Sequence, residues 1–449
     1  MSSDITATLA EFTVGLKYED IPERVRENCR VLLLDTLACA VAGHLGEETP
    51  QIAAMTSALG QSKESSIIGG GQSTLAGATM LNGFLITAVT MCDVHRSTLT
   101  HITPEVMPPA LAIAERDGLS GRELLTALVA GCEVTTRIGI SLDSKEFRKR
   151  GWHGPGVVGP FGSAAAVGRL RRFDAETMAR AFGLAGSQSA GTFAAWGTPT
   201  VKFHQCRGAL SGLMAALLAE QKFVATREFL TAPDGGLYST YTSGGRPQEA
   251  VAALGQRWEM EQIALRLWPS ASTIQGMITA MFDLVEKNQL KPAAVKKIRV
   301  AMGKTAVDLH GIFPQYKAKF EALLSTHYAA AAILHDRELS LTQFEPARYA
   351  DPVLRRFAAE QVEMVVDTSL SGVQAVVEAE TTDGRTLSER CEYPLGSSER
   401  PLTRAQVENK FRSYARSRLP AARIEQVVAA VGAIENLGSV AELMTLLRA

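Results

Sequence analysis

Two histidines and a carboxylate stand close together in "MCDVHRSTLTHITPEVMPP", residues 91–109. Asp93, His95 and His101 fall within nine residues, although the whole chain has only eight histidines. Pro108 and Pro109 suit the first turn of a helix, so they predict that His101 lies in a loop leading into a helix. A helix N-terminus attracts carboxylates, and a histidine there can donate to an anion or take a proton from carbon. The alternative is a capped turn whose histidines face solvent.

Two further stretches place cationic side chains just before helices rich in small residues. In "FRKRGWHGPGVVGPFGSAAA" a basic run leads into Trp152 and His153, and the glycines that follow let a backbone approach a ligand closely. In "GTPTVKFHQCRGALSG" the side chains of Lys202, His204 and Arg207 stand at a helix start, where they suit an anion. Each stretch, taken alone, fits a solvated basic surface turn better than a binding site.

A fourth stretch, "RLWPSASTIQGMITA", indicates a break between two parts of the chain. Trp268 and Pro269 interrupt the pattern, and Ser270, Ser272 and Thr273 can each cap the helix that follows. This arrangement predicts a hinge between domains, and a hinge is compatible with a binding site.

Signals for other kinds of site are missing. The six cysteines form no CxxC pair, which argues against a zinc knuckle and against a disulfide framework. His95 and His101 lack the spacing of a helical zinc pair, and no third ligand stands out, so we expect no metal site. The glycines of "SIIGGGQS" match no nucleotide-binding pattern, and the GxSxG motif of hydrolases is absent.

Composition narrows the class of protein further. The net charge of −1 gives no indication of nucleic-acid or membrane-surface binding. The first residues lack the features of a signal peptide, and no apolar run reaches the length expected of a membrane span. We therefore expect a cytoplasmic protein that binds neither nucleic acid nor membrane.

The hydrophobic pattern predicts a mainly α fold. Residues 1–266 read as successive helices whose small residues indicate a tightly packed, all-α bundle. Residues 267–400 add strand patterns such as "VKKIRVAMG" and "VEMVVD", which indicate a smaller α+β domain. Residues 401–449 return to helical periodicity, so the helical domain is expected to be discontinuous, with the α+β domain inserted in it.

Taken together, these stretches resemble the MmgE/PrpD family along nearly the whole chain. The resemblance rests on "LLLDTLACAVAG", "LNGFLITAVT", the His101 loop with "PPALAIAE", "GWHGPGVVGPFGSAAA", "GLAGSQSAG", "KFHQCRGALSGLMAALLA" and the C-terminal "IENLGSVAELMTLL". It implies a helical domain, an α+β lid domain and a basic cleft between them, in a homodimer. It also implies a small, anionic di- or tricarboxylate substrate and no cofactor.

The resemblance also implies roles for individual residues. His101 and His153 match two active-site histidines of the family, and Lys202 lies near the position of a lysine that usually stands three residues before the match of His204. Here Val201 takes that place. Catalytic roles are therefore expected for His101, His153 and Lys202. Substrate-binding roles are expected for a second group, namely Asp93, His95, Trp152, His204, Ser272 and Gln275.

Two departures from the family pattern bear on the reaction. Met91 stands where lyases of the family often carry an aspartate, and Gln275 stands where decarboxylase-type members carry a histidine. Family reactions remove a proton or a carboxylate from a carbon next to a carboxylate. The altered residues favour an epimerase of the iminodisuccinate epimerase type. The alternatives are a lyase of the 2-methylcitrate dehydratase or cis-aconitate decarboxylase type, and an inactive carboxylate-binding homologue.

Overall fold

The structure is a computed structural model that describes residues 4–449. The chain divides into two compact units, and the boundaries fall after Ala264 and after Leu402. The helical unit holds residues 4–264 together with 403–449, and the mixed unit holds residues 265–402. The predicted fold class, mainly α with an inserted α+β domain, is confirmed.

The helical unit consists almost entirely of α-helices. In chain order they are α1 (Ile5–Gly15), α2 (Glu23–Ala42), α3 (Thr49–Leu59), α4 (Leu75–Ala88), α5 (Thr103–Arg116), α6 (Gly121–Ser141), α7 (Ser144–Lys149), α8 (Gly154–Leu170), α9 (Ala175–Gly186), α10 (Thr200–Glu220), α11 (Leu237–Tyr241), α18 (Arg404–Ala415), α19 (Ala421–Gly432) and α20 (Val440–Leu446). Two small antiparallel ladders, which the sequence did not indicate, pair β1 (Ser65–Ser66) with β2 (Gln72–Ser73) and β3 (Val94–His95) with β4 (Ile263–Ala264).

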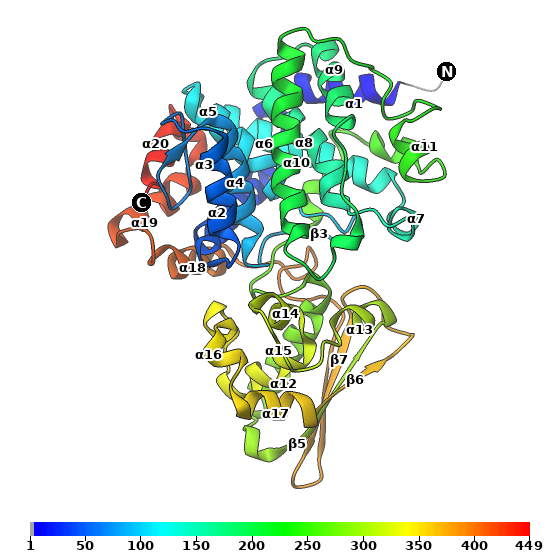
Figure 1. The fold of residues 1–449 in the computed structure, drawn as a ribbon, viewed down its shortest axis with the longest axis vertical. Coiled ribbons are helices and arrows are strands. Elements are labelled where there is room, and N and C mark those ends of the chain that lie inside the picture. The colour runs from blue at the N-terminus through cyan, green and yellow to red at the C-terminus, as the bar shows by residue number, and fades with distance from the viewer. Residues whose placement is uncertain (1–3) are drawn as a thin grey trace. The chain divides into compact units, whose positions relative to one another are not determined.

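Glycines bring α6, α8 and α10 into close contact, and Figure 1 shows α8 and α10 side by side in the helical unit. A Cβ added to Gly212 of α10 would lie 2.4 Å from the Pro160 carbonyl oxygen of α8. A Cβ added to Gly131 of α6 would lie 2.7 Å from the Gly162 carbonyl oxygen. Backbones can approach this closely only where side chains are missing, which is how small-residue helices form a dense core.

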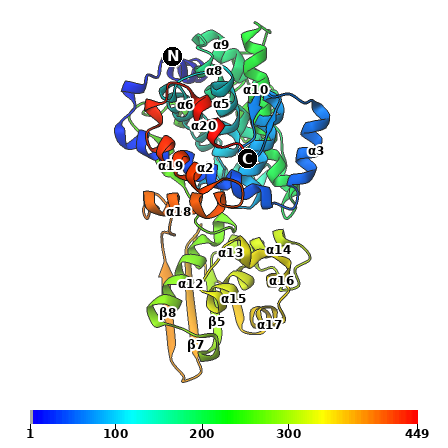
Figure 2. The ribbon, with the colours of Figure 1, turned by 90° about the vertical axis from the view of Figure 1, so that its left-hand side faces the viewer.

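The C-terminal helices return to the first helices of the chain, and Figure 2 shows α18 and α19 beside α2. Lys410 of α18 forms a fully buried ion pair with Asp35 of α2, with Nζ 2.7 Å from Oδ1. The end of the chain is fixed by backbone hydrogen bonds, because the Gly69 N–H donates to Leu447 and the Ala449 N–H donates to Gly70.

The expectation that no segment is long and apolar enough to cross a bilayer is wrong, because two helices pass this test. The segments Glu23–Leu45 and Gly121–Ser141 both meet that test of length and composition. However, 78% and 94% of their apolar windows are buried inside the structure. Both segments therefore serve as core helices, whose apolar surface is covered by neighbouring helices.

The mixed unit combines a four-stranded sheet with helices. Its strands are β5 (Val295–Met302), β6 (Val362–Val366), β7 (Ala375–Thr381) and β8 (Thr386–Cys391), in the order β6-β5-β7-β8. The pair β5–β6 is parallel and the other pairs are antiparallel. Its helices are α12 (Gln275–Asn288), α13 (Lys304–His310), α14 (Lys319–Leu324), α15 (Thr326–Asp336), α16 (Pro346–Tyr349) and α17 (Pro352–Glu360). Strands β7 and β8 form a hairpin that turns at Gly384, where φ is +86°.

Candidate active site

The loop before α5 is held by Asp93, which is buried with 1% of its surface exposed. Its carboxylate accepts hydrogen bonds from the Ile102 N–H at 2.8 Å, the Thr103 N–H at 3.2 Å and the Thr103 hydroxyl at 2.5 Å. Burial raises the pKa of Asp93, whereas the Thr103 hydroxyl and the charge of His101 act in the opposite direction. Asp93 therefore satisfies free N–H groups at the start of α5.

The start of α5 differs from the expected one. The helix begins at Thr103, so Pro104 lies in the first turn, whereas Pro108 and Pro109 lie inside the helix. The expectation that Pro108 and Pro109 open the helix is therefore wrong, since another proline already occupies the position where a missing N–H costs nothing. His101 lies in the loop that leads into the helix, two residues before its first residue, as expected.

The ring of His101 is oriented by the backbone of Asp93. Its Nδ1 lies 2.6 Å from the Asp93 carbonyl oxygen and 3.7 Å from the thiol sulfur of Cys92. A carbonyl can only accept, so Nδ1 carries a proton, and whenever the ring is neutral Nε2 carries the lone pair. His101 is thereby set up as a base at Nε2, which is the tautomer that a proton-abstracting histidine requires.

His153 and His204 form a direct pair, with 3.0 Å between their Nδ1 atoms. His153 is the residue before α8, and His204 lies in the first turns of α10. The glycines around them make this approach possible. A Cβ added to Gly156 would lie 2.2 Å from the Ala190 carbonyl oxygen, and one added to Gly191 would lie 3.0 Å from His204 Nδ1. The glycine-rich stretch thus allows a close contact with another segment of the protein, at Ala190.

The pair is held in its neutral form. Burial lowers the pKa of His153 to about 3, with further contributions from His204, His101 and Arg148. Burial and the charge of Arg207 lower the pKa of His204. When two neutral imidazoles meet at Nδ1, one ring donates there and the other accepts. One ring then presents a basic Nε2 and the other presents an N–H at Nε2, so the pair offers one base and one donor.

Aromatic side chains lie on one side of the histidine pair. The ring of Phe193 lies 6.2 Å from the ring of His153 and stacks on Trp196 at 5.1 Å. The guanidinium carbon of Arg148 lies 3.0 Å from the centre of the Phe193 ring. Trp152, an expected substrate contact, packs at 4.7 Å against another aromatic ring. These rings shield the site from water on the side that they cover.

Lys202 is placed apart from the histidines by the geometry of α10. It stands two residues before His204, and two residues turn a helix by about 200°, so the two side chains point to different faces. Lys202 is buried, and its Nζ lies 3.1 Å from Oε2 of Glu48. The spacing that departs from the family pattern therefore puts the lysine in an ion pair beside α3.

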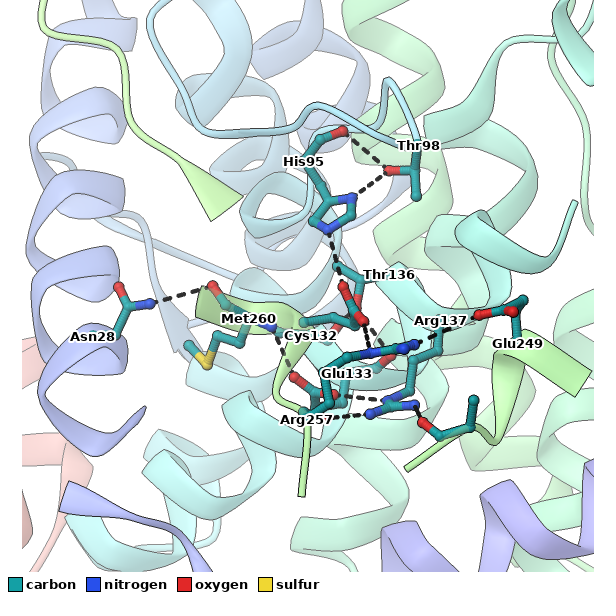
Figure 3. Close-up of polar contacts among 12 residues, drawn as sticks. Asn28, His95, Thr98, Cys132, Glu133, Thr136, Arg137, Glu249, Arg257 and Met260 are labelled. Atoms are coloured by element: carbon teal, nitrogen blue, oxygen red, sulfur yellow. Dashed lines mark hydrogen bonds and ion pairs between the residues drawn. The ribbon is translucent and has the colours of Figure 1, made fainter. Parts of the chain in front are cut away.

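His95 belongs to a buried polar network, which Figure 3 shows together with Glu133, Arg137 and Arg257. Its Nδ1 lies 3.1 Å from the Thr98 hydroxyl, and its Nε2 lies 3.7 Å from a carboxylate oxygen of Glu259. The network continues through the fully buried Glu133–Arg137 ion pair at 2.8 Å. These contacts give His95 a structural role in fixing the loop that ends at His101.

The remaining expected residues lie in the mixed unit. Ser272 opens a short 3₁₀ turn, Ser272–Ile274, and Gln275 begins α12. The buried amide nitrogen of Gln275 lies 3.3 Å from the Trp268 carbonyl oxygen and 3.4 Å from that of Ser270. Gln275 therefore fixes the turn at the start of the unit. Between residues 4 and 449, no group of three or more His, Cys, Asp or Glu side chains could hold a metal ion.

One buried acid was not predicted from the sequence. Glu105, in the first turn of α5, is fully buried, and neither carboxyl oxygen has a hydrogen-bond partner among residues 4–449. The side chain of Glu105 occupies space left open by Gly159, since a Cβ added to Gly159 would lie 2.4 Å from the Glu105 carboxyl carbon. Burial, followed by the nearby Asp93, raises the pKa of Glu105 well above its usual value. Burial therefore favours the neutral form of the Glu105 carboxyl group.

Comparison with known proteins places the whole chain in one family. The MmgE/PrpD N-terminal domain matches residues 7–250, and the MmgE/PrpD C-terminal domain matches residues 268–433. The chain is 28% identical to a cis-aconitate decarboxylase-like protein of Aspergillus oryzae, over 99% of this chain and 97% of that protein. It is 26% identical to cis-aconitate decarboxylase of Aspergillus terreus, over 99% and 96%. It is 27% identical to the human cis-aconitate decarboxylase, over 100% and 95%. The chain belongs to the MmgE/PrpD family.

Proposed function

We propose that this protein is a cofactor-independent carbon–carbon lyase that decarboxylates a small tricarboxylate of the cis-aconitate type. Relatives that match it over nearly its whole length are named as cis-aconitate decarboxylases or as a cis-aconitate decarboxylase-like protein. Their names support the lyase alternative better than the epimerase that the altered residues favoured. The observation that carries the proposal is the neutral His153–His204 pair, whose Nδ1 atoms lie 3.0 Å apart.

Decarboxylation makes two demands on the site. When the bond to the departing carboxylate breaks, its electron pair stays on the substrate carbon and CO₂ leaves. That carbon must then receive a proton, and the negative charge that develops must be stabilised meanwhile. An imidazole N–H of one ring supplies the proton, and the basic Nε2 of the other ring takes up a proton from solvent, so the pair returns to its neutral state. The ring of His101, fixed by Asp93, orients the reacting group. Surrounding aromatic rings keep water from competing as the proton donor.

A single NMR experiment tests the proposal. The protein is incubated in D₂O with cis-aconitate and with a panel of other di- and tricarboxylates. A decarboxylase converts cis-aconitate into a five-carbon dicarboxylate that carries one deuterium, and it releases CO₂. An epimerase instead exchanges the proton next to a carboxylate and leaves the carbon count unchanged. Water loss would indicate a dehydratase. Exchange or water loss without release of CO₂ from any acid of the panel would overturn the proposal.

A further inference from the structure

Arg148 is a half-buried cation beside the histidine pair that has no anionic partner. Its guanidinium forms no hydrogen bond and no ion pair with any of the described residues, 4–449. The nearest acid on the same helix, Glu146, is engaged with Arg150 instead, at 3.2 Å. Most of the chain's other partly buried arginines, such as Arg30 and Arg171, bind carboxylates within the protein. The N–H donors of Arg148 are therefore available to bind a ligand.

The position of Arg148 is fixed although its charge is not neutralised. Its guanidinium lies over the ring of Phe193, which also approaches His153 at 6.2 Å. Segment 191–193 runs beside segment 151–153, because the His153 N–H donates to Gly191 at 3.0 Å and the Phe193 N–H donates to Gly151 at 2.7 Å. A bridge between Trp152 and Thr192 completes this pairing. The guanidinium and the imidazole pair are therefore held by one framework.

The chemistry of this arrangement indicates its ligand. Guanidinium groups stacked on an aromatic ring bind carboxylates through two parallel hydrogen bonds. Arg148 is partly buried, so some of its water is already removed, and this burial lowers its pKa. Its charge also helps to lower the pKa of His153, so an anion bound to Arg148 would act on the histidine pair directly.

Resting on the proposed function, we propose that Arg148 binds a carboxylate of the substrate other than the one that is lost, and that it makes the enzyme selective for acids with several carboxylates. The substrate then lies across Phe193, with one carboxylate on the guanidinium and the reacting carbon facing the His153–His204 pair. Neutralisation of Arg148 by the substrate removes one of the charges that depress the basicity of His153. Substrate binding therefore prepares the pair for proton transfer.

The test compares Arg148→Gln and Arg148→Lys with a matched control, Arg150→Gln. Arg150 lies two residues away, is exposed and is already paired with Glu146 and Ser243. We expect Arg148→Gln to raise KM for the tricarboxylate about 10- to 100-fold, the range of a lost charge-assisted pair. Arg148→Lys should recover part of this loss, because lysine restores the positive charge but lacks the two parallel N–H donors of a guanidinium. Arg150→Gln should change KM less than about twofold.

A second measurement separates binding from turnover. Calorimetric titration with propane-1,2,3-tricarboxylate, which cannot react, should show the same loss of affinity in Arg148→Gln. Against a monoamide of the substrate that lacks the carboxylate bound by Arg148, wild type and Arg148→Gln should be equally weak. Thermal unfolding of each variant shows that the fold is intact.

Three results would overturn the inference, and they are distinguishable from one another. Equal affinity of wild type and Arg148→Gln for the tricarboxylate would show that Arg148 does not bind it. A fall in kcat with unchanged KM and unchanged titration would place Arg148 in the chemical step instead. A wild-type protein that neither binds nor converts any tricarboxylate would overturn the proposed function, and this inference with it.

Discussion

The Nδ1 atoms of His153 and His204 lie 3.0 Å apart, and this contact joins the start of α8 to α10. A hydrogen bond between these atoms needs one proton, so the two rings must adopt different tautomers. If both rings were protonated, two N–H groups would face each other at this distance and repel. The pair is therefore built for a neutral state in which one ring can give up a proton while the other accepts one.

The depressed pKa of His153 predicts how stability depends on pH. The unfolded histidine binds a proton below about pH 6.5, whereas the folded one does so only near pH 3. Between these values the unfolded state holds more protons, so stability falls as the pH falls. Between pH 7 and pH 5, this group should cost wild type about 2 kcal/mol of unfolding free energy. Urea denaturation at both pH values should show a smaller loss in His153→Gln, and an equal loss would contradict the assignment.

Replacement of His101 tests whether its oriented ring takes part in the chemical step. His101→Gln should retain the fold, since a glutamine amide can still donate to the Asp93 carbonyl oxygen that now holds Nδ1. It should retain much of the substrate affinity and lower kcat by about 10²-fold or more, the usual scale for general acid–base catalysis. Steady-state kinetics and thermal unfolding measure both. The control is His335→Gln, because His335 lies in the mixed unit, where it bonds to Ala331 of its own helix and packs against Phe357. Normal turnover in folded His101→Gln protein would remove His101 from the mechanism.

Glu105 should lower the stability of the fold as the pH rises, whereas His153 lowers it as the pH falls. Its raised pKa means that the folded state keeps a proton that the unfolded state loses above about pH 4.3, so stability falls as the pH rises. Glu105→Met keeps an unbranched side chain in the slot beside Gly159 and removes the unsatisfied carboxyl. We expect a gain of about 1–3 kcal/mol at pH 7. The gain should be smaller below pH 4, where the unfolded state also keeps the proton. A loss of stability at pH 7 would show that the carboxyl has a partner it needs.

The buried ion pair between Lys410 and Asp35 predicts a strong coupling between the ends of the helical unit. Lys410→Met would leave the Asp35 carboxylate buried without its cation, which should cost about 3–5 kcal/mol. Asp35→Leu combined with Lys410→Met should recover most of this loss, because no charge then remains buried. Chemical denaturation of the two single variants and the double variant measures the coupling. Additive effects in this cycle would mean that the two residues do not act as a pair.

Much of the fold could be predicted because its signals are local. Periodicity and turn residues mark the helices, and alternating β-branched residues mark β5 and β6, so the mainly α class with an α+β insertion follows directly. The early start of α5 was missed because three prolines compete for the same role, and only packing decides between Pro104 and the pair at positions 108 and 109.

The candidate site could be predicted only in part, because contacts between distant segments carry no local signal. His101 and His153 could be singled out by type and position, but the contact of His153 with His204 depends on how α8 meets α10. Lys202 lies on a different face of α10 from His204 because the two residues are two positions apart, and the sequence did show this spacing. Glu105 gave no signal at all, since a polar residue in a first helical turn normally faces solvent.

The buried bond between Lys410 and Asp35 has a consequence for how the chain acquires its structure during synthesis. The two partners are 375 positions apart, and the whole mixed unit is translated between them. At about 5–20 residues per second, the ribosome needs tens of seconds to deliver Lys410 after Asp35 has emerged. Throughout that interval the nascent helical unit carries an aspartate in an apolar environment and lacks the helices that cover α2. Chaperone occupancy on the growing chain should therefore persist until residues 403–449 have left the exit tunnel.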